Sequence, residues 1–438
     1  MSNAVESSGT ESLSRNGRLL ILITAFLGWM GAGIEMSLMV PTTRPAIQDF
    51  TARSLAESES AESIDPEEMR TRIETSADQW LSWFIAAFLL GAALGGLVFG
   101  WLGDRIGRAK SMGLSILCYS VITAMSYFVT SPEQLLILRF LACMGIGGMW
   151  PCGVALVMEA LPGMTRAFLA GWIGCSANVG FLILGLVMLQ SPITRDSWRW
   201  VFLFGGSPAI LGLIVLAFVP ESPRWLSRED EPTGSSPLQE VFGPKLLKLT
   251  LLGIALGTVP LLGGWASGQR LIPWAGQVGE AEGLAQLKAQ VQVCWAIGAV
   301  LGSLVGGWFA SWLGERLSYF LISLLSLGLS GYIFLGLDPT MGAFLPAAFA
   351  LGLISTMFFG WLPYFLPTLF PLRVRATGTG VAFNFGRIFS VVALLSSTAL
   401  SAAFAGNIAK MGATTSLIYA VGLVLVWLIP KHSQLDAG

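Results

Sequence analysis

Residues 91–108 read GAALGGLVFGWLGDRIGR, and residues 302–319 read GSLVGGWFASWLGERLSY. Seven of these eighteen positions are identical, and Asp104 is matched by Glu315. A second pair of segments has nearly the same spacing, because Pro162-x-x-x-Arg166 resembles Pro371-x-x-x-Arg375. Both pairs lie about half a chain apart. The sequence therefore predicts two copies of one unit with the same orientation, as in membrane folds built from parallel repeats.

Few side chains of this protein are suited to face water. The 438 residues are 54% hydrophobic and 12% charged, against about 25% charged in soluble globular domains, and mean hydropathy is +0.70. A water-soluble protein is therefore excluded. Since 25 basic residues oppose 26 acidic ones, nucleic acid is not expected as a partner. The five cysteines lie in apolar runs without CxxC spacing, so no disulfide framework, metal site or cofactor is expected.

Twelve apolar runs approach the roughly 20 residues that a helix needs to cross about 30 Å of hydrocarbon. They cover 19–43, 79–101, 111–130, 135–158, 167–189, 199–219, 246–267, 288–311, 317–337, 341–366, 376–403 and 411–430. We predict an all-α membrane protein with twelve transmembrane helices in two pseudo-symmetric six-helix bundles, over 17–219 and 246–431. A linker at 220–245, a disordered N-terminus at 1–16 and a tail at 432–438 complete the chain, which we expect to be a monomer in the bilayer.

Most short loops with basic residues fall on one side, which predicts that this side and both termini are cytoplasmic in a cell membrane. The largest outer loop, 47–78, holds nine acidic and three basic residues. Within it Asp65-Pro66-Glu67-Glu68 predicts a helix start, because Asp caps, Pro fits the first turn and acids favour the positive helix end. The loop is either a solvated spacer or a lid over an outer entrance.

Several motifs resemble those of the major facilitator superfamily. The stretch GWLGDRIGR at 100–108 resembles the family's signature between its second and third helices, and RFLACMGIGG at 139–148 resembles its fourth-helix pattern. PESPRWL at 220–226 is similar to the sugar-porter and organic-ion branches, and LPTLFPLRVRATG at 366–378 to bacterial symporters for organic acids and sugars. Two features depart from the pattern. Ser318 and Tyr319 replace Gly and Arg in the second copy, and span 5 lacks the Gly-Pro signature of drug/proton antiporters.

The resemblance implies a cytoplasmic gate, whose salt bridges form between the two halves in one conformer and break in the other. The candidate gate residues are Gly100, Asp104, Arg105, Gly107, Arg108, Glu159, Arg166, Glu221, Arg224, Glu315, Arg316 and Arg375.

Ionisable residues inside spans are costly, by about 2.5 to 3.5 kcal/mol on insertion scales, and mark functional sites. WMGAGIE at 29–35 resembles the first-helix pattern of aromatic-acid/proton symporters, with Ala32 where that pattern has its first acid. A desolvated carboxyl can exchange a proton near neutral pH. Glu35 is therefore the candidate for proton coupling, and the alternative is a structural carboxylate paired with an arginine.

Arg387 in span 11 is suited to clamp a substrate carboxylate with its planar fork of donors, or else it packs helices. Arg139 is expected to stabilise span 4. The remaining candidates for substrate binding are two amides in equivalent spans and two tryptophans: Asn178, Asn384, Trp29 and Trp361. The alternative for the tryptophans is that they pack against other helices or face lipid.

The resemblance and the intramembrane charges predict a secondary active transporter for a small organic solute, a carboxylate or a sugar, with proton symport and alternating access. The alternatives are an uncoupled facilitator or antiporter of organic ions and a transporter-like nutrient receptor. An enzyme is disfavoured, because no His/Asp/Glu cluster, nucleophile motif or phosphate loop stands out.

Overall fold

The computed structural model describes residues 13–56, 66–161, 164–191, 193–227, 236–264, 269–284, 286–395, 404 and 407–430, and within these ranges the regular structure is entirely helical. The N-half comprises α1 (Arg15–Ala56), α2 (Pro66–Ile106), α3 (Arg108–Met125), α4 (Pro132–Ala160), α5 (Arg166–Gln190), α6 (Trp200–Gly206) and α7 (Ala209–Phe218). The C-half comprises α10 (Leu247–Gly263), α11 (Gln269–Ala281), α12 (Leu287–Leu313), α13 (Glu315–Gly336), α14 (Phe344–Phe365), α15 (Arg375–Asn384), α16 (Gly386–Leu395), α18 (Ile408–Ser416) and α19 (Ile418–Leu425).

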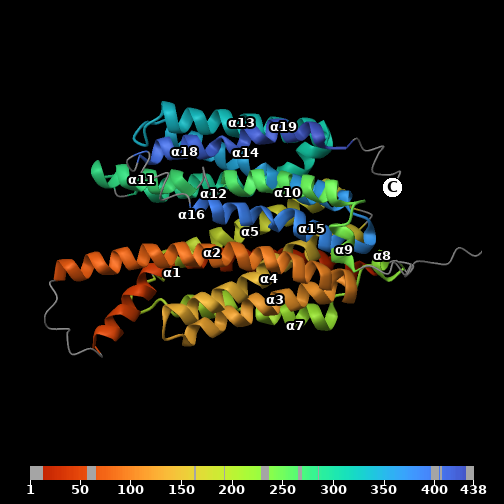
Figure 1. Cartoon of the computed structure of the whole chain (residues 1–438), viewed down its shortest axis with the longest axis horizontal. Helices are drawn as coiled ribbons and strands as arrows, with labels where there is room; N and C mark the ends of the chain where they lie inside the picture. Colours follow the sequence, from red (N-terminus) through yellow and green to blue (C-terminus); the bar gives the residue numbers. More distant parts are fainter. Residues whose placement is uncertain are drawn as a thin grey trace, which may run out of the picture.

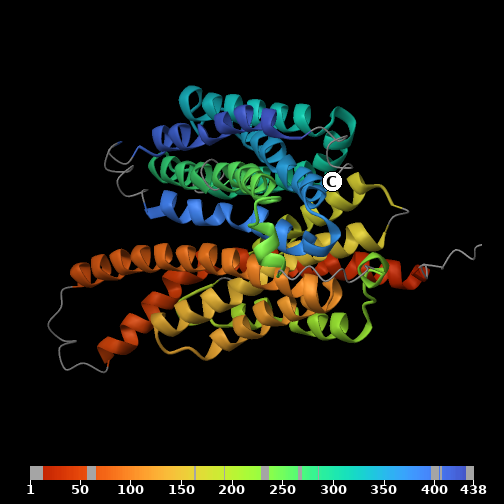
Figure 2. The ribbon, with the colours of Figure 1, turned by 45° about the vertical axis from the view of Figure 1, so that its right-hand side comes forward.

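The two halves form separate layers in Figure 1, with α1–α4 and α7 below and α10–α14, α16, α18 and α19 above. Figure 2 keeps the same separation after rotation. Between the halves run the linker helices α8 (Pro223–Leu226) and α9 (Pro237–Val241). They lie at one end of the molecule, which also carries Asp104 and which we call the Asp104 end.

Ten helices in the described residues are long and apolar enough to cross a membrane. The two remaining apolar runs of the sequence are shorter or interrupted as helices. The run 246–267 contains α10, of 17 residues, and the run 376–403 contains α15 and α16, which are separated at Phe385. The end of this second run, 396–403, lies outside the described residues, as do residues 1–12 and the tail 432–438.

The acidic segment 47–78 is less of a loop than the sequence suggested. Helix α1 continues to Ala56, and α2 begins at Pro66 with Glu67 and Glu68 in its first turn, so the predicted helix start is confirmed. The extension of α1 is held by Asp49, which accepts hydrogen bonds from Arg53 (2.9 Å), Arg199 (2.5 Å) and Trp198 (3.1 Å). Helix α1 begins at Arg15, so residues 15 and 16 of the segment that the sequence predicts to be disordered are helical, and residues 1–12 of that segment lie outside the described residues. Helix α11 was not predicted.

Small residues let the two halves approach closely at two places. A side chain on Gly380 of α15 would clash with the Gly96 carbonyl of α2, and one on Gly307 of α12 would clash with the Ala167 carbonyl of α5. Both contacts join a helix of the N-half to a helix of the C-half. The same kind of close packing therefore occurs at each of the two lines where the halves meet.

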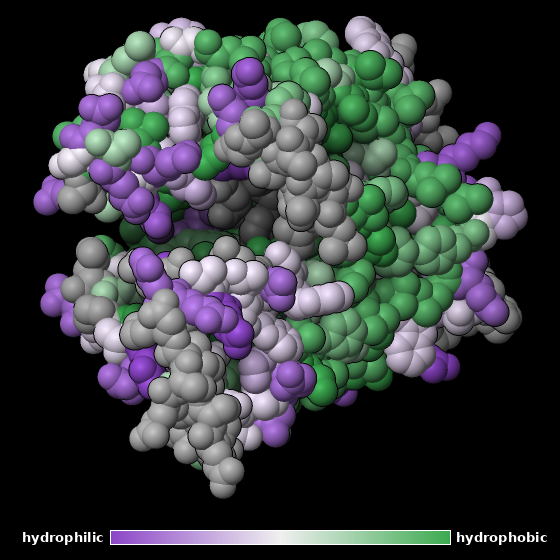
Figure 3. Space-filling view, turned by 60° about the vertical axis from the view of Figure 1, so that its left-hand side comes forward, coloured by the Kyte–Doolittle hydropathy of each residue, from purple (hydrophilic) through white to green (hydrophobic). Residues whose placement is uncertain are grey.

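The surface separates into apolar and polar zones (Figure 3). A broad hydrophobic surface covers the side of the molecule, as expected of helices in contact with lipid tails. At the end away from Asp104, a recess lies between the two halves, and hydrophilic side chains gather on its rim.

Candidate functional site

Asp104 joins the two halves at one end of the molecule. Its side chain is buried in the last turn of α2, and it accepts hydrogen bonds from the start of α15 in the C-half. The donors are the backbone N–H groups of Ala376 (3.1 Å) and Thr377 (2.8 Å) and the Thr377 hydroxyl (2.6 Å). A carboxylate at a helix N-terminus satisfies its free N–H groups and the positive end of the helix dipole. Asp104 therefore caps a helix of the opposite half.

Arg108 extends this contact into a buried network. Its guanidinium pairs with Asp104 (3.0 Å) and Glu159 (3.2 Å) and donates to the Leu372 carbonyl of the C-half (2.6 Å). Arg375 of the C-half lies 3.4 Å from the same Glu159 carboxylate. Asp104, Arg108 and Glu159 belong to the N-half, so two acids and one base of this half hold the beginning of α15.

The linker reinforces the network from outside. Glu221 accepts the Ala109 N–H at 3.0 Å and so caps α3, and burial raises the pKa of this carboxyl above its ordinary 4.5. Gly107, between α2 and α3, has φ of 115° and leaves no room for a side chain beside Glu221. Arg373 forms an ion pair with Glu240 of α9.

Other gate candidates lie outside the network. Arg105 stacks on Trp101 (5.1 Å), Arg166 lies 5.9 Å from the Tyr364 ring of the C-half, and Arg224 is exposed on α8. In the second copy of the repeat, Arg316 donates to the Ile429 carbonyl within the C-half (2.9 Å), and Glu315 begins α13. Gly100 packs its backbone against the start of α15.

Glu35 forms a buried ion pair with Arg139 of α4. The same carboxylate oxygen accepts a hydrogen bond from Thr123 of α3 (3.2 Å), and Arg139 also donates to the Glu35 backbone carbonyl (3.3 Å). The second carboxylate oxygen, Oε2, has no hydrogen-bond partner in the described residues. The pair joins α1 to α4 and leaves one acid oxygen without a donor.

Arg387 is buried on α16 without an acidic partner in the part of the chain that the structure describes. Its guanidinium lies over the rings of Phe88 (4.8 Å) and Phe383 (5.7 Å), and its Nε has no hydrogen-bond partner there. A buried cation is costly unless an anion accompanies it. The described residues therefore provide this guanidinium with no anion.

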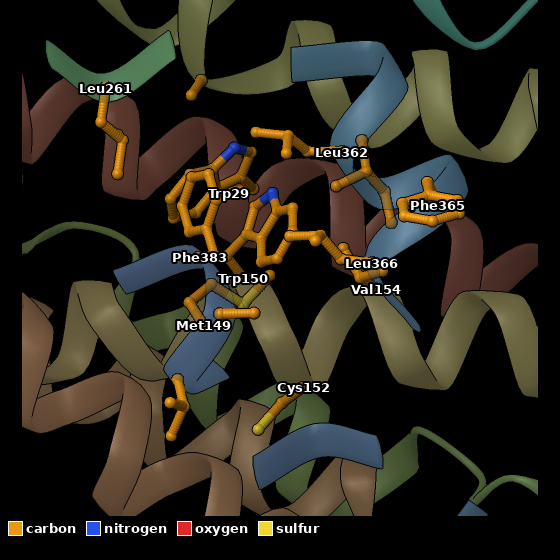
Figure 4. Close-up of a cluster of buried hydrophobic side chains, with 14 of the residues drawn as sticks. Trp29, Met149, Trp150, Cys152, Val154, Leu261, Leu362, Phe365, Leu366 and Phe383 are labelled. Carbon is orange, nitrogen blue, oxygen red and sulfur yellow. The ribbon is translucent and has the colours of Figure 1, made fainter. Parts of the chain in front are cut away.

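Aromatic side chains of both halves meet near this arginine. Trp150 of α4 stacks on Phe383 of α15, with ring centroids 4.0 Å apart, and Trp29 of α1 lies beside them (Figure 4). Trp361 takes no part in this stack: it packs on Tyr319, and its indole N–H donates to the Glu315 carbonyl (3.1 Å). The cluster forms an apolar wall shared by the two halves.

The two candidate amides both bridge the halves. Asn178 of α5 donates to the Ser303 hydroxyl of α12 (2.8 Å), and Asn384 of α15 donates to the Gly147 carbonyl of α4 (3.0 Å). The Oδ1 atom of Asn384 has no partner in the described residues. Both amide N–H₂ groups thus hold the halves together, and the free amide oxygen lies three residues before Arg387.

Sequence reasoning missed the partners that complete the site. Thr123, Thr377 and the backbone N–H groups of α15 carry no motif, and Phe88 is one of 26 phenylalanines in the chain. The preference of acids for helix N-termini is a usable signal for α15, because Arg375-Ala-Thr follows a proline-containing loop. No comparable signal points to Phe88.

The buried charges between two helical layers with an apolar exterior are the features of a multi-pass membrane transporter. The family model of the Major Facilitator Superfamily matches residues 21–394, and the chain belongs to this family. It is therefore a transporter and not an enzyme.

Named relatives and a solved structure agree. The chain is 27% identical to a "Probable 4-methylmuconolactone transporter" of Cupriavidus pinatubonensis (78% of this chain, 80% of the relative). It is 26% identical to a "Cis,cis-muconate transport protein" of Acinetobacter baylyi (70% and 74%). The fold is similar to that of the proton:xylose symporter XylE bound to 6-bromo-6-deoxy-D-glucose, with a TM-score of 0.73 and 17% identity over 97% of this chain and 99% of that one.

Proposed function

We propose that the chain is a proton-coupled symporter of small organic carboxylates. The observation that carries this proposal is Arg387, a buried guanidinium between the halves whose contacts in the described residues are aromatic rings. A substrate carboxylate would complete the charge balance with two parallel hydrogen bonds. The free Oδ1 of Asn384 supplies an acceptor for a hydroxyl or a protonated group of the same solute.

The aromatic cluster favours an unsaturated or aromatic acid. The stacked Trp150 and Phe383 and the adjacent Trp29 offer flat apolar surfaces next to the cation. The names of the relatives point in the same direction, since cis,cis-muconate is a conjugated dicarboxylate. A sugar, the solute class of the structural relative, would leave the Arg387 charge without an anion.

Glu35 is the proposed proton carrier. When it is ionised, the ion pair balances the Arg139 charge, and when it is protonated, the pair weakens. Its Oε2 atom has no donor in the described residues, so it is the oxygen where a proton can bind. Proton binding and release at this position would thereby alter the contact between α1 and α4.

The Asp104 network serves as the gate in an alternating-access cycle. It closes the Asp104 end, while the recess lies at the other end (Figure 3). Basic loops favour a cytoplasmic position for the Asp104 end and for both termini, which makes this conformer open to the outside of the bacterial inner membrane.

Transport into proteoliposomes tests the proposal. With an imposed pH gradient, labelled cis,cis-muconate and benzoate should accumulate above their equilibrium level, and xylose should not. R387K should raise the half-saturation concentration about tenfold or more, because Lys cannot form the bidentate pair. E35Q should abolish pH-driven accumulation but retain exchange of labelled for unlabelled solute. An R387K value equal to that of the wild type would exclude the clamp.

The E35Q result separates the alternatives. Accumulation by E35Q equal to that of the wild type would favour an uncoupled facilitator or antiporter. S207A, in the break between α6 and α7, is a matched control, because its hydroxyl only donates to the Phe204 carbonyl (2.8 Å). It should leave both readouts unchanged.

A further inference from the structure

The ring of Phe88 of α2 contacts two buried cations that come from opposite halves. The guanidinium carbon of Arg139 is 5.4 Å from the ring centroid, and that of Arg387 is 4.8 Å from it. Since both distances end at the same centroid, the two guanidinium groups are no more than about 10 Å apart. Phe88 itself is buried, so both contacts are shielded from water.

The two cations differ in their other partners. Arg139 has the Glu35 carboxylate, whereas the Arg387 side chain has ring contacts as its partners in the described residues. In the described residues, Cys143, one turn after Arg139 on α4, and Tyr119 of α3 are titratable groups that interact with these charges, and Cys118 of α3 interacts with Cys143. A thiol and a phenol are ordinarily neutral near neutral pH, so the Glu35 carboxylate is the anionic group beside these guanidinium groups in the described residues.

An aromatic ring attracts cations through the negative potential of its face, and the attraction is strongest where water is excluded. A ring that contacts two cations stabilises both and thereby keeps them near one another. If the charge of one cation ceases to be balanced, the positive potential at the other rises, because little water is present to screen it.

We propose that Phe88 is a positioning residue that couples proton binding at Glu35 to anion binding at Arg387. This inference rests on the proposed function. A proton that binds Oε2 of Glu35 removes the negative charge beside Arg139, and the Phe88 ring keeps the unbalanced guanidinium close to the anion site. The carboxylate then binds Arg387 more tightly. Release of the proton from Glu35 restores the ion pair and weakens anion binding.

Binding of cis,cis-muconate to the purified full-length protein at pH 5.5 and pH 8 tests this coupling. The wild-type Kd, corrected for the protonation of muconate itself, should be at least tenfold lower at pH 5.5. In F88L, which removes the ring at similar volume, the ratio of the two Kd values should fall to less than threefold. F88Y, which keeps the ring, should retain most of the wild-type ratio.

The ratio distinguishes coupling from a merely structural role, because loss of packing would weaken binding equally at both pH values. An F88L ratio that stays tenfold or more overturns the inference, and so does an F88Y ratio as small as that of F88L. If F88L unfolds, F88M provides the same comparison with a flexible side chain. A wild-type protein that fails to bind, or binds without pH dependence, contradicts the proposed function instead.

Discussion

The two copies of the repeated segment, 91–108 and 302–319, end their first helices at different places. In the first copy α2 runs to Ile106, and the residue with positive φ is Gly107. In the second copy α12 ends at Leu313, and the residue with positive φ is Gly314, which aligns with Gly103. The helix of the second copy therefore ends about one turn earlier, although the sequences match at this point.

This shift changes what the aligned acids do. Asp104 lies in the last turn of its own helix, next to the negative end of the helix dipole, and it binds the N-terminus of α15 in the other half. Glu315 lies in the first turn of α13, where the dipole of its own helix favours it. One acid therefore joins the halves, while the other is placed to stabilise the helix on which it lies.

The last residues of the two copies differ in the same way. Arg108 donates to the Leu372 carbonyl of the opposite half, whereas the hydroxyl of Tyr319 donates to Leu256 of its own half (2.8 Å). Close backbone packing, by contrast, occurs at both lines of contact between the halves. The repeats have kept their packing, while Asp104 and Arg108 of the first copy form charged contacts with the opposite half and Ser303 of the second copy accepts a neutral hydrogen bond from Asn178.

The largest losses of stability and uptake should come from substitution at the last position of the repeat, which is Arg108 in the first copy and Tyr319 in the second. R108Q leaves the buried carboxylates of Asp104 and Glu159 without their main cation, which costs about 3–5 kcal/mol in comparable buried pairs. Y319F removes one neutral hydrogen bond, worth about 1 kcal/mol. Thermal unfolding in detergent and the initial uptake rate should both fall much more in R108Q. Equal losses in the two variants would contradict the comparison.

The next effect should be on the balance of conformers. D104N removes the charge that holds α15, and the loss of charge-assisted hydrogen bonds should disfavour closure of the Asp104 end by about 2–3 kcal/mol. Electron–electron distances between spin labels at the exposed Lys110 and Lys248 should lengthen and broaden in a background without native cysteines. T377V removes the Thr377 hydroxyl, which is one of the hydrogen-bond donors to Asp104. It should produce the same change in the distances to a smaller extent. Unchanged distances in D104N would exclude Asp104 as a latch.

The sequence predicted much of this fold because hydropathy and repeats report it directly. Runs such as 135–158 and 167–189 coincide with α4 and α5, and the Pro66 helix start follows from its local residues. The sequence did not predict the break at Phe385. It also did not predict the length of α1, because Pro41 and Pro45 lie inside that helix and do not end it. The extension of α1 is held by the contacts of Asp49 with Arg199 and Trp198, which are distant in the sequence.

The candidate site was predicted only in part, for a related reason. Charged residues such as Glu35 and Arg387 are conspicuous in apolar runs, and the sequence alone identifies them. Their partners are set by three-dimensional proximity: Phe88 is an ordinary apolar residue, and the groups that bind Asp104 include backbone N–H groups. Asp104 and Glu315 occupy the same motif position, so their different contacts depend on where each helix ends.

The symmetric part of the comparison is testable through the glycines. G380A and G307A each place a methyl group against a carbonyl of the opposite half, and overpacking of this kind costs about 1–3 kcal/mol. We expect the two variants to slow initial uptake by similar factors, within about threefold of each other. G328A, whose new methyl group meets open space, should resemble the wild type. A large difference between G380A and G307A would mean that the packing, too, has diverged.

The smallest effect concerns the cap of the helix that follows each copy. The first turn of α3 contains no acid, and Glu221 of the linker supplies the carboxylate, whereas α13 has Glu315 in its own first turn. Burial raises the pKa of Glu221, so the folded protein retains this proton to higher pH than the unfolded chain. The stability contributed by this proton is therefore fully present below a pH of about 4.5. It is lost as the pH rises through the raised pKa of Glu221 in the folded protein.

E221Q, which has no proton to lose, tests this sign. The unfolding temperature of the wild type relative to E221Q should decline between pH 4.5 and pH 7, and the difference should be constant at higher pH. A difference that rises over this interval would mean that the hydrogen bonds from α3 outweigh burial and keep the carboxylate ionised. In that case Glu221 would stabilise the start of α3 through its negative charge, as Glu315 is placed to do for α13. The two helix starts would then differ only in whether the acid belongs to the linker or to the helix itself.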